Sequence, residues 1–248
     1  MADGPRQGVV KKFLIAFDFD DTVIAANSDL YICRLAPQGE IPQHIKALYS
    51  KHGWTHYMSA IFTYLHENGT VPDDMLRCMR EIDFINGMKG LFHFLNDNNF
   101  DIIIISDSNS VFIDCILTSA GVAPLVQKVY TNPAKFDEKG QLHLDCYHLQ
   151  DWCNLSTVNL CKGHILKTHV EEQRKIGVEY DVVCYVGDGS NDVCPCLKLS
   201  SRDIAFPRVG YKLMSELDRR HEEVNAKVIP WQSGSDIMEA LQTEVLTA

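Results

Sequence analysis

Three short, largely apolar runs constrain the fold of this chain more than any other feature of its sequence. They span residues 13–17, 101–105 and 180–186, and small polar or acidic residues follow each of them. A helical pattern comes after each polar loop. Short uninterrupted apolar runs are typical of strands buried on both faces, and repeated strand, loop and helix indicates a parallel sheet. We therefore predict an α/β fold with the three runs in one parallel sheet.

A long segment without strand signals separates the first two runs. Pro72, followed by two aspartates, is typical of a helix start. An apolar stripe at helical spacing precedes it, formed by Trp54, Tyr57, Met58, Ile61, Phe62 and Leu65. Connections of this length are unusual in a compact domain. We expect residues 28–86 to form a helical cap domain, inserted into a core made of residues 1–27 and 87–248.

The rest of the chain offers further elements. We expect a hairpin over residues 130–147, with its turn at 137–140. The other expected elements are helices over 109–120, 162–175 and 192–199, strands near 203–206 and 227–229, and a last helix after Ser233.

Polar clusters lie where the three predicted strands end. Asp18 and Asp20 follow the first run, Ser106 and Asp107 the second, and the segment 187–192 the third. Ligands bind beyond the carboxyl ends of parallel strands, so the three clusters are expected to meet. A single aspartate there is commonly a helix cap, but three ordered clusters indicate a site. Crowded carboxylates repel each other unless a hard cation lies among them, and Mg²⁺ fits such oxygen ligands.

Four motifs carry a resemblance to a known superfamily. They are Asp-x-Asp-x-Thr at 18–22, Ser106 after the second run, Lys162 before a helix, and Gly-Asp-x-x-x-Asp at 187–192. In this order they resemble the motifs of the haloacid dehalogenase-like hydrolases, over nearly the whole chain. The resemblance implies a Rossmann-like parallel sheet core with a small all-helical cap of the C1 type.

Longer segments resemble a narrower group of small phosphatases. They lie at 27–29, 105–114, 131–133, 159–162, 187–195 and 205–211. One branch of this group is phosphoethanolamine/phosphocholine phosphatase, and a sibling branch is pyridoxal-phosphate phosphatase, to which the segment 106–114 is more similar. The resemblance implies a Mg²⁺-dependent phosphatase that acts on a small phosphorylated metabolite, pyridoxal 5′-phosphate first and phosphoethanolamine or phosphocholine as the alternative. The motifs are also compatible with a phosphotransferase, and the fold with a non-catalytic binding protein.

The resemblance also implies catalytic and metal-binding roles. Asp18 would be the nucleophile that forms an aspartyl-phosphate, and Asp20 the acid and base. Asp18, the backbone carbonyl of Asp20, and Asp188 would bind Mg²⁺. Asp192 would bind the ion through water or orient Lys162.

Further residues would bind the substrate. Ser106 and Lys162 would hold the phosphoryl oxygens with help from Asn191, although a helix-start serine and a solvated lysine are the ordinary interpretations. Asp29 and Asp107 would set specificity beneath the cap, or would be simple caps or surface acids. Trp54 and Tyr57 would form an aromatic wall or, more in keeping with their helical stripe, part of the cap interior.

Charge and cysteine content narrow the range of partners and cellular compartments. The net charge of −10 argues against binding to nucleic acid or an anionic membrane, and no run is long enough to span a bilayer. No secretory signal is recognisable, which favours a cytoplasmic protein. The nine cysteines are spaced irregularly, without Cys-x-x-Cys, and are expected to be reduced. Ser156 stands where the resembled family usually has a cysteine, so the sequence alone leaves open whether the stretch 146–161 binds a metal.

Overall fold

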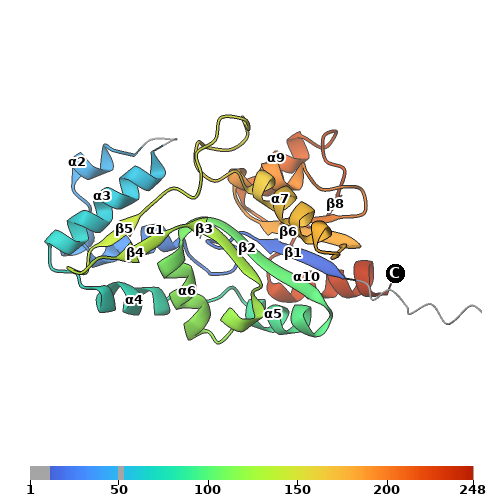
Figure 1. Ribbon diagram of the computed structural model, residues 1–248, viewed down its shortest axis with the longest axis horizontal. Helices are drawn as coiled ribbons and strands as arrows, with labels where there is room; N and C mark the ends of the chain where they lie inside the picture. Colours follow the sequence, from blue (N-terminus) through green and yellow to red (C-terminus); the bar gives the residue numbers. More distant parts are fainter. Residues whose placement is uncertain (1–11, 50–52, 248) are drawn as a thin grey trace, which may run out of the picture.

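The computed structural model describes residues 12–49 and 53–247. A six-stranded parallel sheet forms the centre of this structure (Figure 1). Its strands are, in spatial order, β3 (Lys128–Asn132), β2 (Phe100–Asn109), β1 (Phe13–Phe17), β6 (Val182–Gly187), β7 (Ile204–Pro207) and β8 (Lys227–Val228). All of these strands pair in parallel. The α/β fold with the three apolar runs at its centre is confirmed.

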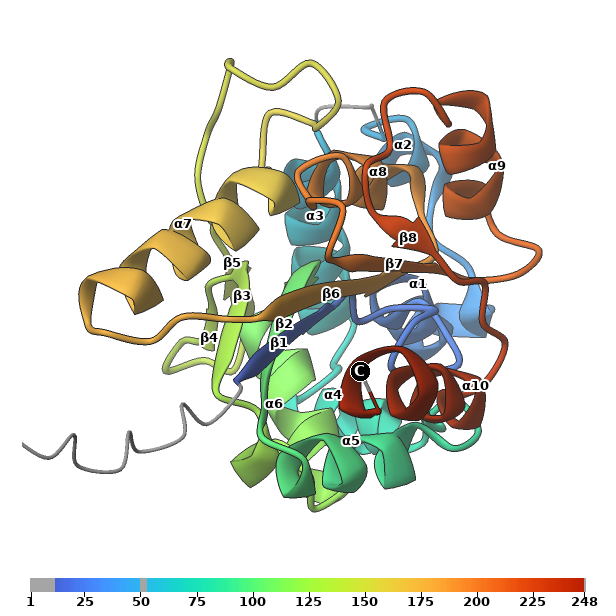
Figure 2. The same ribbon diagram turned by 90° about the vertical axis from the view of Figure 1, so that its right-hand side faces the viewer.

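Helices cover both faces of the sheet, which explains why β1 is apolar at every position. Phe13, Ile15 and Phe17 point to one face, and Leu14 and Ala16 to the other. The first face packs against α5 (Met88–Asp97), α6 (Ser110–Ser119) and α10 (Gly234–Leu241). The second packs against α7 (Lys162–Lys175), α8 (Val193–Cys196) and α9 (Lys212–Arg219). Figure 2 shows α7 and α9 on one side of the sheet and α5, α6 and α10 on the other.

The segment between β1 and α5 is helical, as the sequence predicts. It contains α1 (Ser28–Tyr31), η1 (Ile32–Leu35), η2 (Pro37–Gly39), α2 (Gln43–Lys46), α3 (Trp54–Glu67) and α4 (Pro72–Arg80). Its apolar stripe joins the same hydrophobic cluster as the sheet, and the rings of Phe62 and Phe112 meet edge to face at 5.6 Å. The division into core and cap domains therefore stays a prediction.

A small antiparallel hairpin lies beside this helical segment (Figure 1). It consists of β4 (Ala134–Phe136) and β5 (Leu142–Leu144), and its turn is held by Asp137, whose Oδ1 accepts the N–H groups of Lys139 and Gln141. The Gln141 side chain donates to Thr63 Oγ1 of α3 at 3.0 Å. The hairpin is shorter than the predicted 130–147.

Two predicted boundaries were wrong for the same reason. Residues 128–132 form β3 of the main sheet, and β2 continues to Asn109 rather than stopping near residue 105. Asn109 pairs with Asn132 in the ladder, and Asn132 Nδ2 donates to the carbonyl of Asp107 at 2.7 Å. Pairing with an edge strand keeps these polar residues extended, although no apolar run marks them.

The remaining helical turns are short. η3 (Ala123–Leu125) precedes β3, η4 (Ser190–Asp192) leads directly into α8, and the π-helical turn η5 (Gln242–Leu246) follows α10. The predicted helix over 192–199 is thus only four residues long, with η4 before it, and its third residue is Pro195. Pro195 has no N–H to donate to the carbonyl of Asn191, so η4 and α8 do not form one continuous α-helix.

Candidate active site

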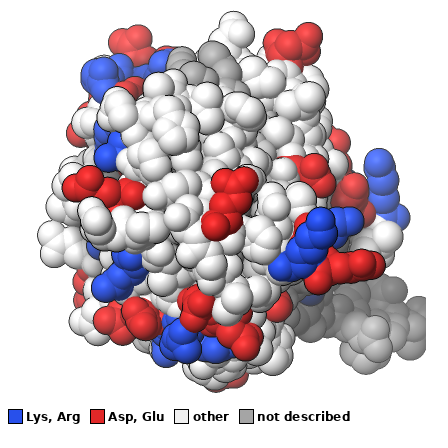
Figure 3. All heavy atoms as spheres, turned by 90° about the vertical axis from the view of Figure 1, so that its left-hand side faces the viewer, with Lys and Arg blue, Asp and Glu red and all other residues white. Residues whose placement is uncertain are grey.

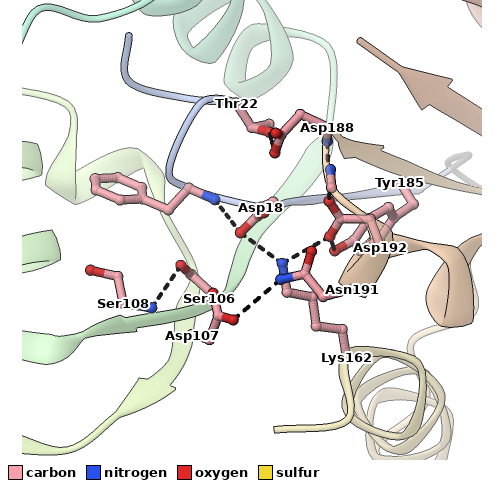
Figure 4. Close-up of polar contacts among 12 residues, drawn as sticks. Asp18, Thr22, Ser106, Asp107, Ser108, Lys162, Tyr185, Asp188, Asn191 and Asp192 are labelled. Atoms are coloured by element: carbon pink, nitrogen blue, oxygen red, sulfur yellow. Dashed lines mark hydrogen bonds and ion pairs between the residues drawn. The ribbon is translucent and has the colours of Figure 1, made fainter. Parts of the chain in front are cut away.

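The carboxyl ends of β1, β2 and β6 meet at one edge of the sheet, and the predicted polar clusters meet there. A cavity of about 570 Å³ opens at this edge, and Asp18, Asp20, Asp29, Asp107 and Asp188 are among its lining residues. Ser106, Lys162 and Asp192 lie behind this lining and are fully buried. Figure 4 shows the polar contacts around Asp18, Lys162 and Asp192.

Lys162 occupies the centre of the buried part of the site. Its Nζ lies 2.8 Å from Asp18 Oδ1 and 2.8 Å from Asp192 Oδ1 (Figure 4). The lysine begins α7, so the start of that helix delivers the cation between β1 and η4. Burial alone would lower the pKa of Lys162, but the charges of Asp18 and Asp192 outweigh it and raise that pKa. The lysine therefore stays charged.

Asp192 accepts hydrogen bonds at both of its carboxylate oxygens. Oδ1 also accepts the hydroxyl of Tyr185, at 2.7 Å, and Oδ2 accepts the N–H groups of Asp188 and Gly189 at 3.1 and 2.9 Å. Gly187 is required beneath it, since a Cβ there would come within 2.6 Å of this carboxylate. Asp192 thus ties Lys162 to the loop after β6.

Three aspartates have a geometry suited to a cation. One carboxylate oxygen from each of Asp18, Asp188 and Asp192 lies within 4.8 Å of the others. Burial, and then the charge of Asp192, raise the pKa of both Asp18 and Asp188, that of Asp188 to about 7. A hard cation would offset this mutual repulsion, and carboxylate oxygens are the ligands Mg²⁺ prefers. The donor set therefore fits Mg²⁺.

The side chain of Asp20 is held away from this group. Its Oδ1 accepts the N–H of Ser28 at 3.1 Å, at the start of α1. Burial raises the pKa of Asp20 well above its ordinary value, and the charge of Asp29 raises it further. The following residue, Asp21, has a φ of 54°, and Arg208 donates to its carbonyl oxygen. Arg208 therefore fixes the turn between Asp18 and the helical segment.

Asp29 lies on the other side of Asp20, at the helical segment. Its Oδ2 accepts the indole N–H of Trp54 at 2.8 Å, while its buried Oδ1 has no partner among the described residues. Burial raises the pKa of Asp29 to about 7, although the hydrogen bond from Trp54 opposes the shift. Trp54 lines the cavity together with Tyr49, and Tyr57 packs behind it at 5.6 Å between ring centroids.

The remaining predicted residues lie between these two regions. Ser106 accepts the N–H of Ser108 at 3.2 Å, and Asn191 Nδ2 donates to Asp107 Oδ2 at 3.3 Å. Thr22 donates to Asp188 Oδ1 at 3.2 Å, across the site from Lys162 (Figure 4). The sequence did not single out the contacts of Tyr185 or the bond between Asp29 and Trp54. No local pattern signals them, because folding brings the partners together.

Fold and site together define a class of protein. Aspartates after β1 and β6 of a parallel sheet, with a buried lysine between them, are the features expected of haloacid dehalogenase-like phosphatases. The family described as "Putative Phosphatase" matches residues 13–245, and the chain belongs to that family. It is a phosphoric monoester hydrolase.

Individual relatives agree with this assignment. Pyridoxal phosphate phosphatase PHOSPHO2 of Bos taurus is 43% identical over 236 residues, which are 93% of this chain and 98% of that protein. Phosphoethanolamine/phosphocholine phosphatase of Gallus gallus is 37% identical over 237 residues, 93% of this chain and 88% of that protein. A solved phosphoserine phosphatase, in apo form, shares the fold, with a TM-score of 0.61, 16% identity and coverage of 94% of this chain and 99% of the other.

Two features concern binding to nucleic acid or membranes: the distribution of basic side chains and the length of the helices. On the face over the helical segment, Lys and Arg side chains lie near the rim and do not gather into one basic patch (Figure 3). None of the helices in the described part of the chain has the length and apolar character needed to span a membrane.

Proposed function

We propose that this phosphatase is Mg²⁺-dependent and hydrolyses pyridoxal 5′-phosphate through an aspartyl-phosphate on Asp18. The observation that carries the reaction is the arrangement at Asp18. Lys162 Nζ and the N–H of Phe19, at 2.8 and 2.7 Å, both contact its Oδ1. The other carboxylate oxygen, Oδ2, is then the one that attacks. This arrangement orients a buried carboxylate as a nucleophile.

Two displacements follow from these positions. Asp18 Oδ2 forms a bond to phosphorus while the bond from phosphorus to the leaving oxygen breaks, and Asp20 gives its proton to that oxygen. Asp20, now a carboxylate, takes a proton from water, whose oxygen attacks phosphorus and releases Asp18 and phosphate. The raised pKa of Asp20 suits it to begin as an acid.

Bound Mg²⁺ would neutralise charge on the phosphoryl oxygens and the attacking carboxylate. Asp18, Asp188 and the backbone carbonyl of Asp20 would hold it. Asp192, whose oxygens already accept from Lys162, Tyr185 and two backbone N–H groups, would act by orienting Lys162. Lys162 and Ser106 would bind the phosphoryl group, with Asn191 at its edge.

The substrate is proposed from similarity and from the cavity wall. The relative 43% identical to this chain acts, by its name, on pyridoxal phosphate. Trp54 and Tyr49 offer aromatic faces to a pyridine ring, and Asp29 lines the same cavity beside Trp54, to which it is hydrogen-bonded. Asp107, which lines the same cavity, would complete recognition. In this proposal residues 28–86 cover the substrate as a cap.

A second candidate is phosphoethanolamine or phosphocholine. The chicken relative has this activity in its name, and acids beside an aromatic side chain also suit an ammonium group. In either case the partner is a small phosphorylated metabolite in the cytoplasm, and neither nucleic acid nor membrane is involved.

The test is phosphate release from a panel of phosphomonoesters, with and without Mg²⁺. The panel holds pyridoxal 5′-phosphate, phosphoethanolamine, phosphocholine, phosphoserine and pyrophosphate. We expect Mg²⁺-dependent release with the highest kcat/KM on pyridoxal 5′-phosphate. A higher kcat/KM on phosphoethanolamine or phosphocholine would favour the second candidate over pyridoxal 5′-phosphate. No release from folded, Mg²⁺-loaded protein would contradict the proposed reaction.

A further inference from the structure

Three cysteines from separate parts of the chain converge behind the active site. Cys194 Sγ lies 3.4 Å from Cys153 Sγ and 3.8 Å from Cys161 Sγ, and all three sulfurs lie within 4.8 Å of one another. Cys161 and Cys194 are buried, and Cys153 is half-buried. None of the three is in a disulfide, and a disulfide would need sulfurs about 2.05 Å apart.

The backbone is arranged to bring these thiols together. Gly163, in the first turn of α7, touches α8 so closely that a Cβ there would lie 2.5 Å from Cys194 Sγ. This close contact places Cys161, the residue before α7, against α8. Cys153 is held by Gln150, which accepts the N–H of Cys153 at 2.8 Å and donates to the carbonyl of Thr157 at 2.6 Å.

Cys153 lies in the loop of residues 145–161, which connects β5 to α7 at the top of Figures 1 and 2. An isolated bridge between Leu149 and Asn159 closes the loop on itself. Long loops without helices or strands of their own are uncommon in compact domains unless they are functional or disordered. A cross-link among the thiols would tie this loop to α7 and α8.

The sulfur spacing suits a tetrahedral metal ion. With Zn–S bonds of about 2.3 Å, tetrahedral geometry places sulfurs ~3.8 Å apart. Two of the three sulfur pairs here, at 3.4 and 3.8 Å, are near that value. Thiolates favour zinc and other soft ions over Mg²⁺, so this site and the carboxylate site select different metals. The helix start at Cys161 also favours the thiolate.

We propose that Cys153, Cys161 and Cys194 bind one Zn²⁺ ion, with water as the fourth ligand. Among the described histidine, cysteine and acidic side chains, no fourth lies within the same spacing of the three sulfurs. The half-buried position of Cys153 gives water access to the ion.

The proposed ion would hold parts of the active site in register. Lys162 follows Cys161 directly, and Asp192 precedes Cys194 by two residues. Two residues before Cys161, Asn159 donates to Thr55 Oγ1 of α3 at 3.3 Å. Zinc would therefore fix the base of α7 to the loop that carries Asp192 and to the helical segment. It would position residues and take no part in the reaction.

Metal content tests the proposal without any use of activity. Wild-type protein is purified without chelator, and its zinc is measured by plasma mass spectrometry. We expect about one zinc per chain, and its loss in the double variant Cys153→Ser/Cys161→Ser. Cys146→Ser is the matched control, because Cys146 is a half-buried thiol of the same loop outside the cluster. It should keep its zinc.

A second measurement does not depend on the folding of variants. Wild-type protein stripped of metal is titrated with Co²⁺, and a thiolate-to-cobalt charge-transfer band should appear and disappear when Zn²⁺ is added, but not when Mg²⁺ is added. Absence of both zinc and this band, or full zinc in the double variant, would overturn the proposal. So would a thiol count two below the nine of the sequence, since that indicates a disulfide.

Discussion

Two groups of buried acids face the same cavity, and they differ in what balances their charge. Asp18 and Asp192 share the ammonium of Lys162. Within the described part of the chain, the donors to Asp20 and Asp29 are neutral groups, among them the N–H of Ser28 and the indole of Trp54. Burial raises the pKa of Asp18 and of Asp20, but a cation opposes the shift strongly only at Asp18. Environments that separate two carboxyls in this way assign one as nucleophile and the other as acid.

The largest expected effect comes from replacing Asp18, the acid whose charge Lys162 balances. Asp18→Asn should lower phosphate release by ~10⁴-fold or more, because the amide cannot form the acyl-phosphate. Circular dichroism should show an unchanged fold, since the amide oxygen still accepts from Lys162. A variant with wild-type turnover would remove Asp18 as the nucleophile.

Replacing Asp20, which has no cation beside it, should lower activity less than replacing Asp18. The size of the loss should depend on the leaving group of the substrate. Asp20→Asn should lower kcat on alkyl phosphates by roughly 10²–10⁴-fold, because the leaving oxygen and the attacking water lose their proton partner. With 4-nitrophenyl phosphate, whose leaving group needs no proton, we expect a rapid burst of nitrophenol before a slow steady state.

Asp21→Asn is the control for this variant, since Asp21 is adjacent but outside the proposed machinery. It should keep wild-type kinetics on both substrates. If Asp20→Asn slowed both substrates equally without a burst, Asp20 would not be the acid.

Replacing Lys162 should lower the free energy of unfolding more than replacing an exposed lysine of the same helix. Lys162→Met leaves two buried carboxylates without a counter-charge and should lower the unfolding free energy by about 3–5 kcal/mol at pH 8 without Mg²⁺. Because burial and Asp192 raise the pKa of Asp18, that carboxyl protonates as pH falls, and the loss should shrink towards pH 5. Urea unfolding at both pH values measures this.

Lys167→Met, at an exposed site of the same helix, is the matched control. Its effect should be small and nearly independent of pH. An equal loss at pH 5 and pH 8 for Lys162→Met would show that the lysine does not balance these acids.

The smallest expected effect is a shift in the pH dependence of kcat/KM when Asp29, the neighbour of Asp20, is replaced. Asp29 has a pKa of about 7, and its charge raises the pKa of Asp20. Asp29→Asn removes this charge, so Asp20 should lose its proton at lower pH. The alkaline limb of the profile of kcat/KM against pH should move down by about one unit or less. A limb that stays in place or moves up would contradict the coupling of these two acids.

The sequence predicts the parts of this molecule that depend on local pattern. Runs such as 13–17 are apolar because both sheet faces are covered, and the acids at their ends meet because parallel strands end together. The sequence analysis placed the site residues in one site because their strands end at the same edge of the sheet. Their individual roles stay predictions. The contacts of Trp54 with Asp29 and of Cys153 with Cys194 join distant segments. Tertiary packing alone decides them, so neither spacing nor periodicity shows them.

The order of the strands also has a consequence for synthesis on the ribosome. β1 pairs with both β2 and β6. Phe13 therefore cannot pair on its second side until Val182 has been synthesised. Non-local parallel pairing forms slowly, and domains fold as units when their chain has emerged. β1 ends one residue before Asp18 and is translated well before Lys162 and Asp192, which can reach it only after they have left the exit tunnel. A nascent chain truncated before α7 would therefore lack the counter-charge of its own nucleophile, and one truncated before β6 would still lack Asp188 and Asp192, so catalytic competence would arise late in translation.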